Sequence, residues 1–158
     1  MVDVLNQEQR RLNMSRIRGK DTKPEMLLRR SLHALGYRYQ LHRPDLIGRP
    51  DLLFPMYKAV IFVHGCFWHG HDNCKYFVMP MTRTDWWSNK IERNKLLDRE
   101  NILKLTSEGW QVYTVFECEL KKEKINHTLS QLLTHLNNTL RTKVLKMDVK
   151  VIHGNLQG

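Results

Sequence analysis

The stretch IFVHGCFWHGHDNC, residues 61–74, constrains this chain more than any other, because it joins an apolar run to a segment rich in metal-binding side chains. The run AVIFVH at residues 59–64 is typical of a central strand that is covered on both faces. Three histidines and two cysteines fall within the fourteen positions of the stretch, beside the aromatic pair Phe67 and Trp68. Each of these side-chain types has a separate chemical use, and the question is whether they serve one function.

The rest of the chain predicts helices and strands around one sheet. Thr22 can cap a helix that has Pro24 in its first turn and ends near Gly36, and a long charged helix extends from Thr84 to Gly109. Further helices are expected near residues 7–18 and 121–140, and strands at 37–43, 52–54, 59–64, 110–118 and 149–152. This order predicts an α/β domain at residues 21–141, a mixed sheet flanked by helices, between an N-terminal arm or helix (1–20) and a C-terminal tail (142–158).

The charge of the chain predicts a polyanionic partner. The formal net charge is +10, from 26 basic and 16 acidic residues, and residues 10–30 carry eight lysines and arginines against Asp21 and Glu25. Nucleic acid is the commonest polyanion in a cell, although a basic face that is merely solvated is the alternative. Because no apolar run reaches membrane-spanning length and no secretory signal is visible, we expect a cytoplasmic protein that contacts no membrane.

The three cysteines suit a metal site better than a disulfide, because nothing predicts export to an oxidising compartment. Cys66, His71 and Cys74 are separated by four and two residues, and Cys118 ends a predicted strand from which it can complete a tetrahedron. Thiolate and imidazole ligands of this kind favour a closed, structural zinc site. Two alternatives stay open: another histidine of the stretch replaces one ligand, or the cysteines are ordinary buried thiols.

A hairpin predicted across the turn PMYK brings a carboxylate close to an imidazole. If Phe54 pairs with Ala59, Asp51 lies opposite Phe62 and at the same end of the hairpin as His64. An aspartate there can hold a hard cation such as Mg²⁺, and a histidine can take a proton from water, which together suits phosphodiester hydrolysis. The alternatives are that Asp51 only caps the turn GRPD and that the histidine is a hydrogen-bonded surface side chain.

Glu25 has two interpretations. It stands three residues after Thr22, so a capping box would account for it fully. It also shares a helix face with Leu28 and Leu32, which directs it toward the core side and allows a catalytic role.

The aromatic residues near the cysteines also have two interpretations. Phe67 and Trp68 are flanked by glycines, and Trp86 and Trp87 begin the long charged helix. Most such side chains belong to a core. On a basic protein, however, large rings in a polar loop are placed to wedge between base pairs and kink the duplex.

Four runs together resemble one family: NMSRIRGKDTKPE, GRPDLLF, VIFVHGCFWHGH and GWQVYTVFEC resemble the very-short-patch repair (Vsr) DNA mismatch endonucleases over about residues 10–120. The resemblance implies a restriction-endonuclease-like fold with a structural zinc site. It also implies an enzyme that uses Mg²⁺ to nick one strand of double-stranded DNA beside the thymine of a T·G mismatch, the product of deaminated 5-methylcytosine. An unpaired or mismatched base costs less to unstack, which fits an aromatic wedge.

The resemblance implies a role for each residue that matches the family pattern. Asp51 would be the metal-binding carboxylate, and the carbonyl of Val63 would be a second Mg²⁺ contact. His69 would be the general base, while His64 and Glu25 would support the water shell of the metal and the scissile phosphate.

The remaining roles implied by the resemblance concern zinc and DNA. The zinc ligands would be Cys66, His71, Cys74 and Cys118. The DNA contacts would be the aromatic wedge of Phe67, Trp68 and Trp87, together with Met14 of the N-terminal arm, Lys90 and Asn94.

The sequence leaves two other functions open. One is a restriction-type nuclease that cuts matched DNA, although the run FVH has neither the acid nor the lysine of the broader restriction-type motif. The other is a zinc-stabilised DNA-binding module without catalysis. We expect a monomer, because one asymmetric lesion needs no twofold symmetry, and the resemblance implies a functional link to a DNA cytosine methyltransferase.

Overall fold

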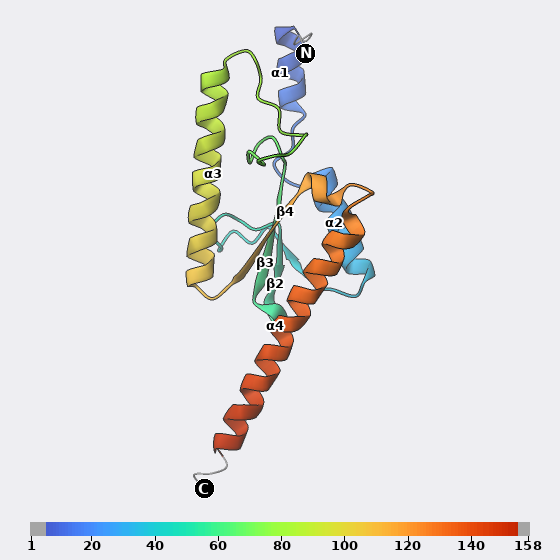
Figure 1. Ribbon diagram of the computed structural model, residues 1–158, viewed down its shortest axis with the longest axis vertical. Coiled ribbons are helices and arrows are strands. Elements are labelled where there is room, and N and C mark those ends of the chain that lie inside the picture. The colour runs from blue at the N-terminus through green and yellow to red at the C-terminus, as the bar shows by residue number, and fades with distance from the viewer. Residues whose placement is uncertain (1–5, 155–158) are drawn as a thin grey trace.

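The computed structural model describes the backbone of residues 6–154 and the side chains of residues 6–141. Its centre is a four-stranded sheet with the strand order β1-β2-β3-β4 (Figure 1). The strands are β1 (Gln40–Leu41), β2 (Leu52–Phe54), β3 (Ala59–His64) and β4 (Gln111–Phe116). Because β3 and β4 pair in parallel and the other neighbours pair antiparallel, the predicted mixed α/β sheet is confirmed.

Helices cover both faces of the sheet. Helices α2 (Lys23–Ala34) and α4 (Ile125–Gly154) lie against one face, and α3 (Thr84–Ser107) lies against the other (Figure 1). Successive residues of β3 alternate between the two cores: Ile61 packs with Leu32 and Leu136, whereas Val60 packs with Leu105 of α3. Alternate residues of the apolar run at 59–64 thus point to opposite faces of the sheet, and both faces are buried, as expected for a central strand.

The parallel pairing of β3 with β4 gathers functional side chains at one edge of the sheet. The register ends with His64 beside Phe116, so both strands stop at the same edge. The loop of residues 65–83 leaves β3 there, and β4 continues there into the 3-10 turn η2 (Glu117–Leu120). Residues far apart in the sequence therefore meet beyond this edge.

The predicted hairpin and its register are confirmed. Phe54 pairs with Ala59, and the turn between them contains the 3-10 helix η1 (Pro55–Tyr57). The backbone N–H of Asp51 donates to the carbonyl of Ile61 at 3.1 Å, which continues the pairing past the start of β2. Asp51 therefore lies at the same end of the hairpin as the last residues of β3.

Helix α2 has a side-chain cap at its N-terminus, whereas helix α3 has none. Thr22 caps α2 as predicted, since its hydroxyl accepts the backbone N–H of Glu25 at 3.5 Å. Helix α3 begins at Thr84, as predicted, but its cap position is Arg83, which has a left-handed backbone (φ 55°) and offers no side-chain cap. The Thr84 hydroxyl donates to the carbonyl of Pro80. The N-terminal helix α1 (Gln7–Ser15) is shorter than the expected 7–18 and is capped by Asn6.

The end of the chain differs from the prediction. Helix α4 runs to Gly154, so the expected helix end near residue 140 and the short strand at 149–152 are both wrong. No proline or glycine interrupts residues 125–153, so helix propagation outweighs the β-branched residues of the tail. The strands predicted at 37–43 and 110–118 are also shorter, and Cys118 lies in η2 just after β4.

Parts of the predicted arm and tail, residues 1–5 and 155–158, lie outside the described residues. Within the described part of the chain, no helix is long and apolar enough to cross a bilayer.

Candidate active site and metal centre

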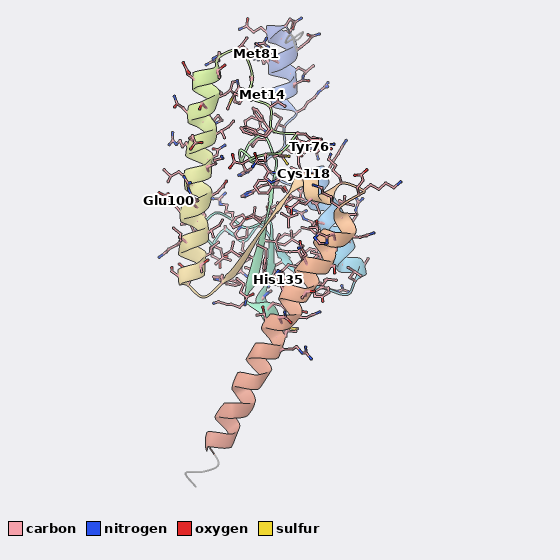
Figure 2. The ribbon with its side chains drawn as sticks, viewed as in Figure 1. Met14, Tyr76, Met81, Glu100, Cys118 and His135 are labelled. Carbon is pink, nitrogen blue, oxygen red and sulfur yellow. The ribbon has the colours of Figure 1, made fainter. Side chains whose placement is uncertain are left out.

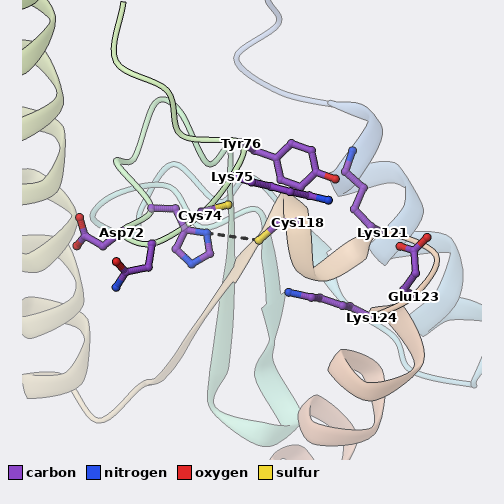
Figure 3. Close-up of a pocket in the computed structure, with 10 residues that line it drawn as sticks. Asp72, Cys74, Lys75, Tyr76, Cys118, Lys121, Glu123 and Lys124 are labelled. Atoms are coloured by element: carbon purple, nitrogen blue, oxygen red, sulfur yellow. Dashed lines mark hydrogen bonds between the residues drawn. The ribbon is translucent and has the colours of Figure 1, made fainter.

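The cysteines and one histidine converge on a single point beyond the edge of the sheet. One ligand atom each of Cys66, His71, Cys74 and Cys118 lies within 4.8 Å of the others. His71 Nδ1 is 3.5 Å from Cys66 Sγ and 3.4 Å from Cys118 Sγ (Figure 3, dashed line). A tetrahedral zinc ion separates a sulfur and a nitrogen ligand by about 3.6 Å, so the cluster is compatible with zinc.

Local packing holds this zinc-compatible cluster together. The backbone N–H of His71 donates to the carbonyl of Cys66 at 2.9 Å, and the His71 ring stacks on Phe116 with ring centres 3.8 Å apart. Gly70 permits this loop, because its φ is +56° and a Cβ there would lie 2.6 Å from Cγ2 of Ile91. The loop therefore depends on a glycine at this position.

Burial makes the thiols of the cluster dependent on a cation. It raises the pKa of Cys66 to about 12 and also raises the pKa of Cys118. Without a metal these groups are neutral thiols, whereas zinc binds thiolates and releases their protons. The donor set thus fits a structural zinc ion that neutralises two buried sulfurs.

A second cluster joins the end of β3 to helix α3. The rings of His64 and His69 stack with centres 3.7 Å apart and planes 5° from parallel. His69 Nδ1 lies 2.6 Å from Asp98 Oδ2, and His64 Nε2 lies 3.9 Å from Asp98 Oδ1. Burial and the nearby His69 lower the pKa of His64 to about 4, against the opposite effect of Asp98, so His64 is neutral at pH 7.

Asp98 was missed by the sequence analysis, although helical periodicity could have located it. It lies seven residues after Ile91 and seven before Leu105, the two buried apolar residues of α3 among the described residues. This is the face that α3 turns toward the sheet. An acidic residue on the buried face of a helix needs a charged or polar partner in the interior.

Asp51 lies beside the backbone of β3. Its Oδ2 accepts the N–H of Val63 at 2.7 Å. Burial, opposed by the hydrogen bond from the Val63 N–H and assisted by the Glu25 carboxylate, raises the pKa of Asp51 to about 6. Asp51 and Glu25 place two carboxylates close together, and a hard cation would neutralise their charge. These residues therefore fit Mg²⁺.

The buried carboxylate of Glu25 accepts three hydrogen bonds at the start of α2. It is 3% exposed, and its two oxygens accept from the Thr22 hydroxyl (3.1 Å), the Asp21 backbone N–H (2.9 Å) and Arg29 (2.8 Å). The Glu25 carboxylate accepts the backbone N–H of Asp21 and not that of the cap residue Thr22, so the reciprocal bond of the predicted capping box is not formed. Glu25 lies near Asp51, and its catalytic role stays a prediction. Asp21, Arg29 and His42 are the other members of this region that the sequence analysis did not predict.

The aromatic residues form a half-exposed cluster between the zinc-compatible loop and α3. The Phe67 ring is 5.3 Å from that of Trp68 and 5.2 Å from that of Trp87, and Trp86 is 45% exposed. Neither buried core cluster of the described residues includes these rings, so the alternative that they are ordinary core residues is not what the packing shows.

The remaining predicted DNA contacts lie around this aromatic cluster. Asn94 donates to the backbone carbonyl of Trp68 at 2.8 Å, which gives it a structural contact, and Lys90 Nζ lies 5.7 Å from the Trp86 ring centre. Met14 on α1 is 47% exposed. Figure 2 places Met14 and Met81 toward the α1 end of the molecule, beyond Tyr76 and Cys118. Their contact with DNA stays a prediction.

Comparison with known proteins agrees with these features. The family model for the DNA mismatch endonuclease Vsr matches residues 2–75. The type II nicking enzyme V.XorIIP of Xanthomonas oryzae pv. oryzae is 49% identical over 120 residues, which cover 76% of this chain and 88% of that protein. The DNA mismatch endonuclease Vsr of Escherichia coli is 41% identical over 126 residues, 79% of this chain and 80% of that protein. The chain therefore belongs to the Vsr endonuclease family, whose members are DNA phosphodiester hydrolases.

Proposed function

We propose that this protein is a Mg²⁺-dependent, strand-specific endonuclease that nicks DNA beside the thymine of a T·G mismatch. The observation that carries the proposal is the 2.6 Å contact of Asp98 with His69 Nδ1, next to a neutral, stacked His64. The relative from Escherichia coli bears the mismatch in its name, and other relatives are named nicking enzymes, which supports cleavage of one strand.

His69 would act as the general base, and its contact with Asp98 supports this role. The Asp98 carboxylate accepts a hydrogen bond from the Nδ1–H of His69, which leaves Nε2 of His69 free to take a proton from water. As the water oxygen bonds to phosphorus, one phosphorus–oxygen bond of the backbone breaks, and Asp98 stabilises the imidazolium that forms. Because His64 stays neutral, it can donate a hydrogen bond to a phosphate oxygen without competing for that proton.

Asp51, the carbonyl of Val63 and Glu25 would hold Mg²⁺ and its water shell. Asp51 would bind the ion directly, since one of its oxygens is engaged by the Val63 N–H and the other is not so held. Glu25 would act through water, because both its oxygens already accept hydrogen bonds within α2. The bound ion would neutralise charge that develops on the phosphate.

Zinc and the aromatic cluster would supply recognition. With zinc held by Cys66, His71, Cys74 and Cys118, the loop that carries Phe67 and Trp68 has a rigid base. These rings, with Trp87, would wedge into the duplex where a mismatched pair unstacks at low cost. Met14, Lys90 and Asn94 would contact the same DNA.

The proposal extends to the fold, the domain bounds and the oligomeric state of the protein. We propose a restriction-endonuclease-like fold, because the mixed sheet presents Asp51 and the end of β3 at one edge, and a monomer with its endonuclease domain at residues 21–141. The arm at residues 1–20 would contact DNA, and residues 142–158 would form a tail. The proposal also includes a cytoplasmic location and a functional link to a DNA cytosine methyltransferase.

The test is cleavage of a duplex with one T·G mismatch, with each strand labelled in turn, in the presence of Mg²⁺. We expect one nick in the thymine strand, and the variant His69→Gln should bind this duplex like the wild type without cutting it. Equal cutting of a matched duplex would favour a restriction-type nuclease. Binding without cutting by the wild type would favour a DNA-binding module.

A further inference from the structure

A buried arginine connects two of the carboxylates near the proposed magnesium site to a histidine. Arg29 of α2 is 5% exposed. Its Nη1 donates to Asp21 Oδ1 at 2.6 Å, and its Nη2 donates to Glu25 Oε2 at 2.8 Å. The same Nη2 lies 2.7 Å from Nε2 of His42, while Nε has no hydrogen-bond partner among the described residues.

The contact between Arg29 and His42 determines which nitrogen of the histidine carries its proton. A guanidinium donates hydrogen bonds and accepts none, so His42 Nε2 must be the acceptor. A neutral imidazole has one protonated nitrogen, so the neutral form of His42 carries its proton on Nδ1. His42 Nδ1 is 4.0 Å from Asp51 Oδ1, which is beyond hydrogen-bond distance but close enough for an electrostatic interaction. The protonated nitrogen is thus the one that lies near the carboxylate proposed to bind Mg²⁺.

The backbone on both sides of Arg29 supports this arrangement. Asp21 has φ +55° and His42 has φ +45°, a conformation that is uncommon for residues other than glycine. Such conformations persist where surrounding contacts hold them, and they gather at functional sites. Here the two left-handed residues are the outer partners of one guanidinium.

Arg29 occupies the place that a cation would take. Ligand atoms of Asp21, Glu25 and His42 lie within 4.8 Å of one another, as in a metal site. The guanidinium already contacts all three, and its fixed charge disfavours a second cation there. Arg29 therefore serves as the resident cation of this cluster, beside the site proposed for Mg²⁺.

We propose that Arg29 and His42 are positioning residues of the active site. Arg29 holds Glu25 and fixes the tautomer of His42, and His42 directs its Nδ1–H toward the free oxygen of Asp51. Neither residue touches the reacting atoms. This inference rests on the proposed function for the role of Asp51 and Glu25, whereas the hydrogen-bond geometry stands without it.

The first test reads the tautomer without metal, DNA or activity. In protein with ¹⁵N-labelled histidine, long-range nitrogen–proton correlation spectra at neutral pH should show His42 protonated on Nδ1, with its signals assigned by their loss in His42→Asn. Arg29→Met should abolish the preference for this tautomer. A His42 ring protonated on Nε2 in the wild type would overturn the proposal.

The second test separates positioning from binding and folding. Arg29→Lys keeps the charge but cannot contact Asp21, Glu25 and His42 together. Partners that orient metal ligands typically contribute about 10–100-fold, and we expect that loss in the single-turnover nicking rate on a T·G duplex. Affinity for the duplex without Mg²⁺ should match that of Arg30→Lys, an exposed position on the same helix. Both variants are assayed well below their Tm, because the loss of buried contacts lowers the Tm of Arg29→Lys.

Two substitutions of His42 test the roles of its two ring nitrogens separately. Asn places an amide donor near the position of Nδ1 and tolerates the left-handed backbone, whereas Gln places an acceptor near Nε2 for Arg29 but loses the donor toward Asp51. We expect His42→Asn to nick faster than His42→Gln. Equal wild-type rates in Arg29→Lys and both His42 variants would overturn the inference. A wild type that leaves the mismatched duplex intact would instead overturn the proposed function, and the tautomer spectra would still decide the geometry.

Discussion

The pair of His69 and Asp98 is the contact whose loss should slow cleavage most specifically. His69 Nδ1 lies 2.6 Å from Asp98 Oδ2, and the Asp98 side chain is 22% exposed. When His69 takes a proton from water, unit charges about 4 Å apart attract by about 4 kcal/mol at an effective dielectric constant of about 20. Solvent screening reduces this to roughly 3 kcal/mol. Asp98→Asn, which keeps the shape and removes the charge, should therefore slow cleavage about 100-fold.

The assay is single-turnover nicking of a T·G duplex with enzyme in excess, so that binding does not limit the rate. Glu100→Gln is the matched control, because Glu100 is an exposed carboxylate on the same helix (Figure 2). Affinity for the duplex without Mg²⁺ should be the same in wild type, Asp98→Asn and the control. If Asp98→Asn nicks at the wild-type rate, the role of Asp98 in supporting a general base is refuted.

Three further predictions concern the zinc site, the magnesium site and the aromatic cluster. Cys118→Ser should lower both the zinc content per chain and the Tm, because a closed zinc site contributes folding free energy; wild-type zinc content would contradict this. Asp51→Asn should raise the unfolding free energy of the Mg²⁺-free protein by about 2 kcal/mol at neutral pH, since the folded-state pKa of Asp51 is about 6, above its unfolded value. In urea titrations this gain should shrink as the pH falls from about 6 to about 4, where the wild-type carboxyl is protonated, and a gain independent of pH would refute the reasoning. Trp68→Ala should weaken binding to a mismatched duplex by about 1–3 kcal/mol and binding to a matched duplex by less, measured by fluorescence anisotropy; equal losses on both would argue against a wedge.

Local patterns in the sequence were sufficient for the sheet and the metal cluster. The apolar run at residues 59–64 and the turn PMYK define the hairpin register, which carries Asp51 to its place beside Val63. Cysteine count and spacing predict the cluster around His71, because three of its members lie in one loop. Apart from the fourth ligand, Cys118, these features depend on neighbours within about a dozen residues of the chain, which is the range over which periodicity and turn chemistry operate.

The rest of the candidate site depends on contacts between distant elements. Asp98 meets His69 only because α3 packs across the sheet, and on the sequence it is one of several acids in a charged helix. Arg29 lies in α2 and His42 just after β1, and the two have no motif in common. The strand prediction at residues 149–152 was wrong for another reason. The β-branched residues there favour a strand locally, but they continue an uninterrupted helix.

The ratio of nicking rates on two duplexes that differ in one base, T·G against T·A, decides whether this protein is a mismatch endonuclease, provided that each strand is labelled in turn and Mg²⁺ is present. We expect a single nick beside the thymine of the mismatched duplex and none, or far slower cutting, in the matched one. Equal rates on the two duplexes, or cutting of both strands, would contradict it.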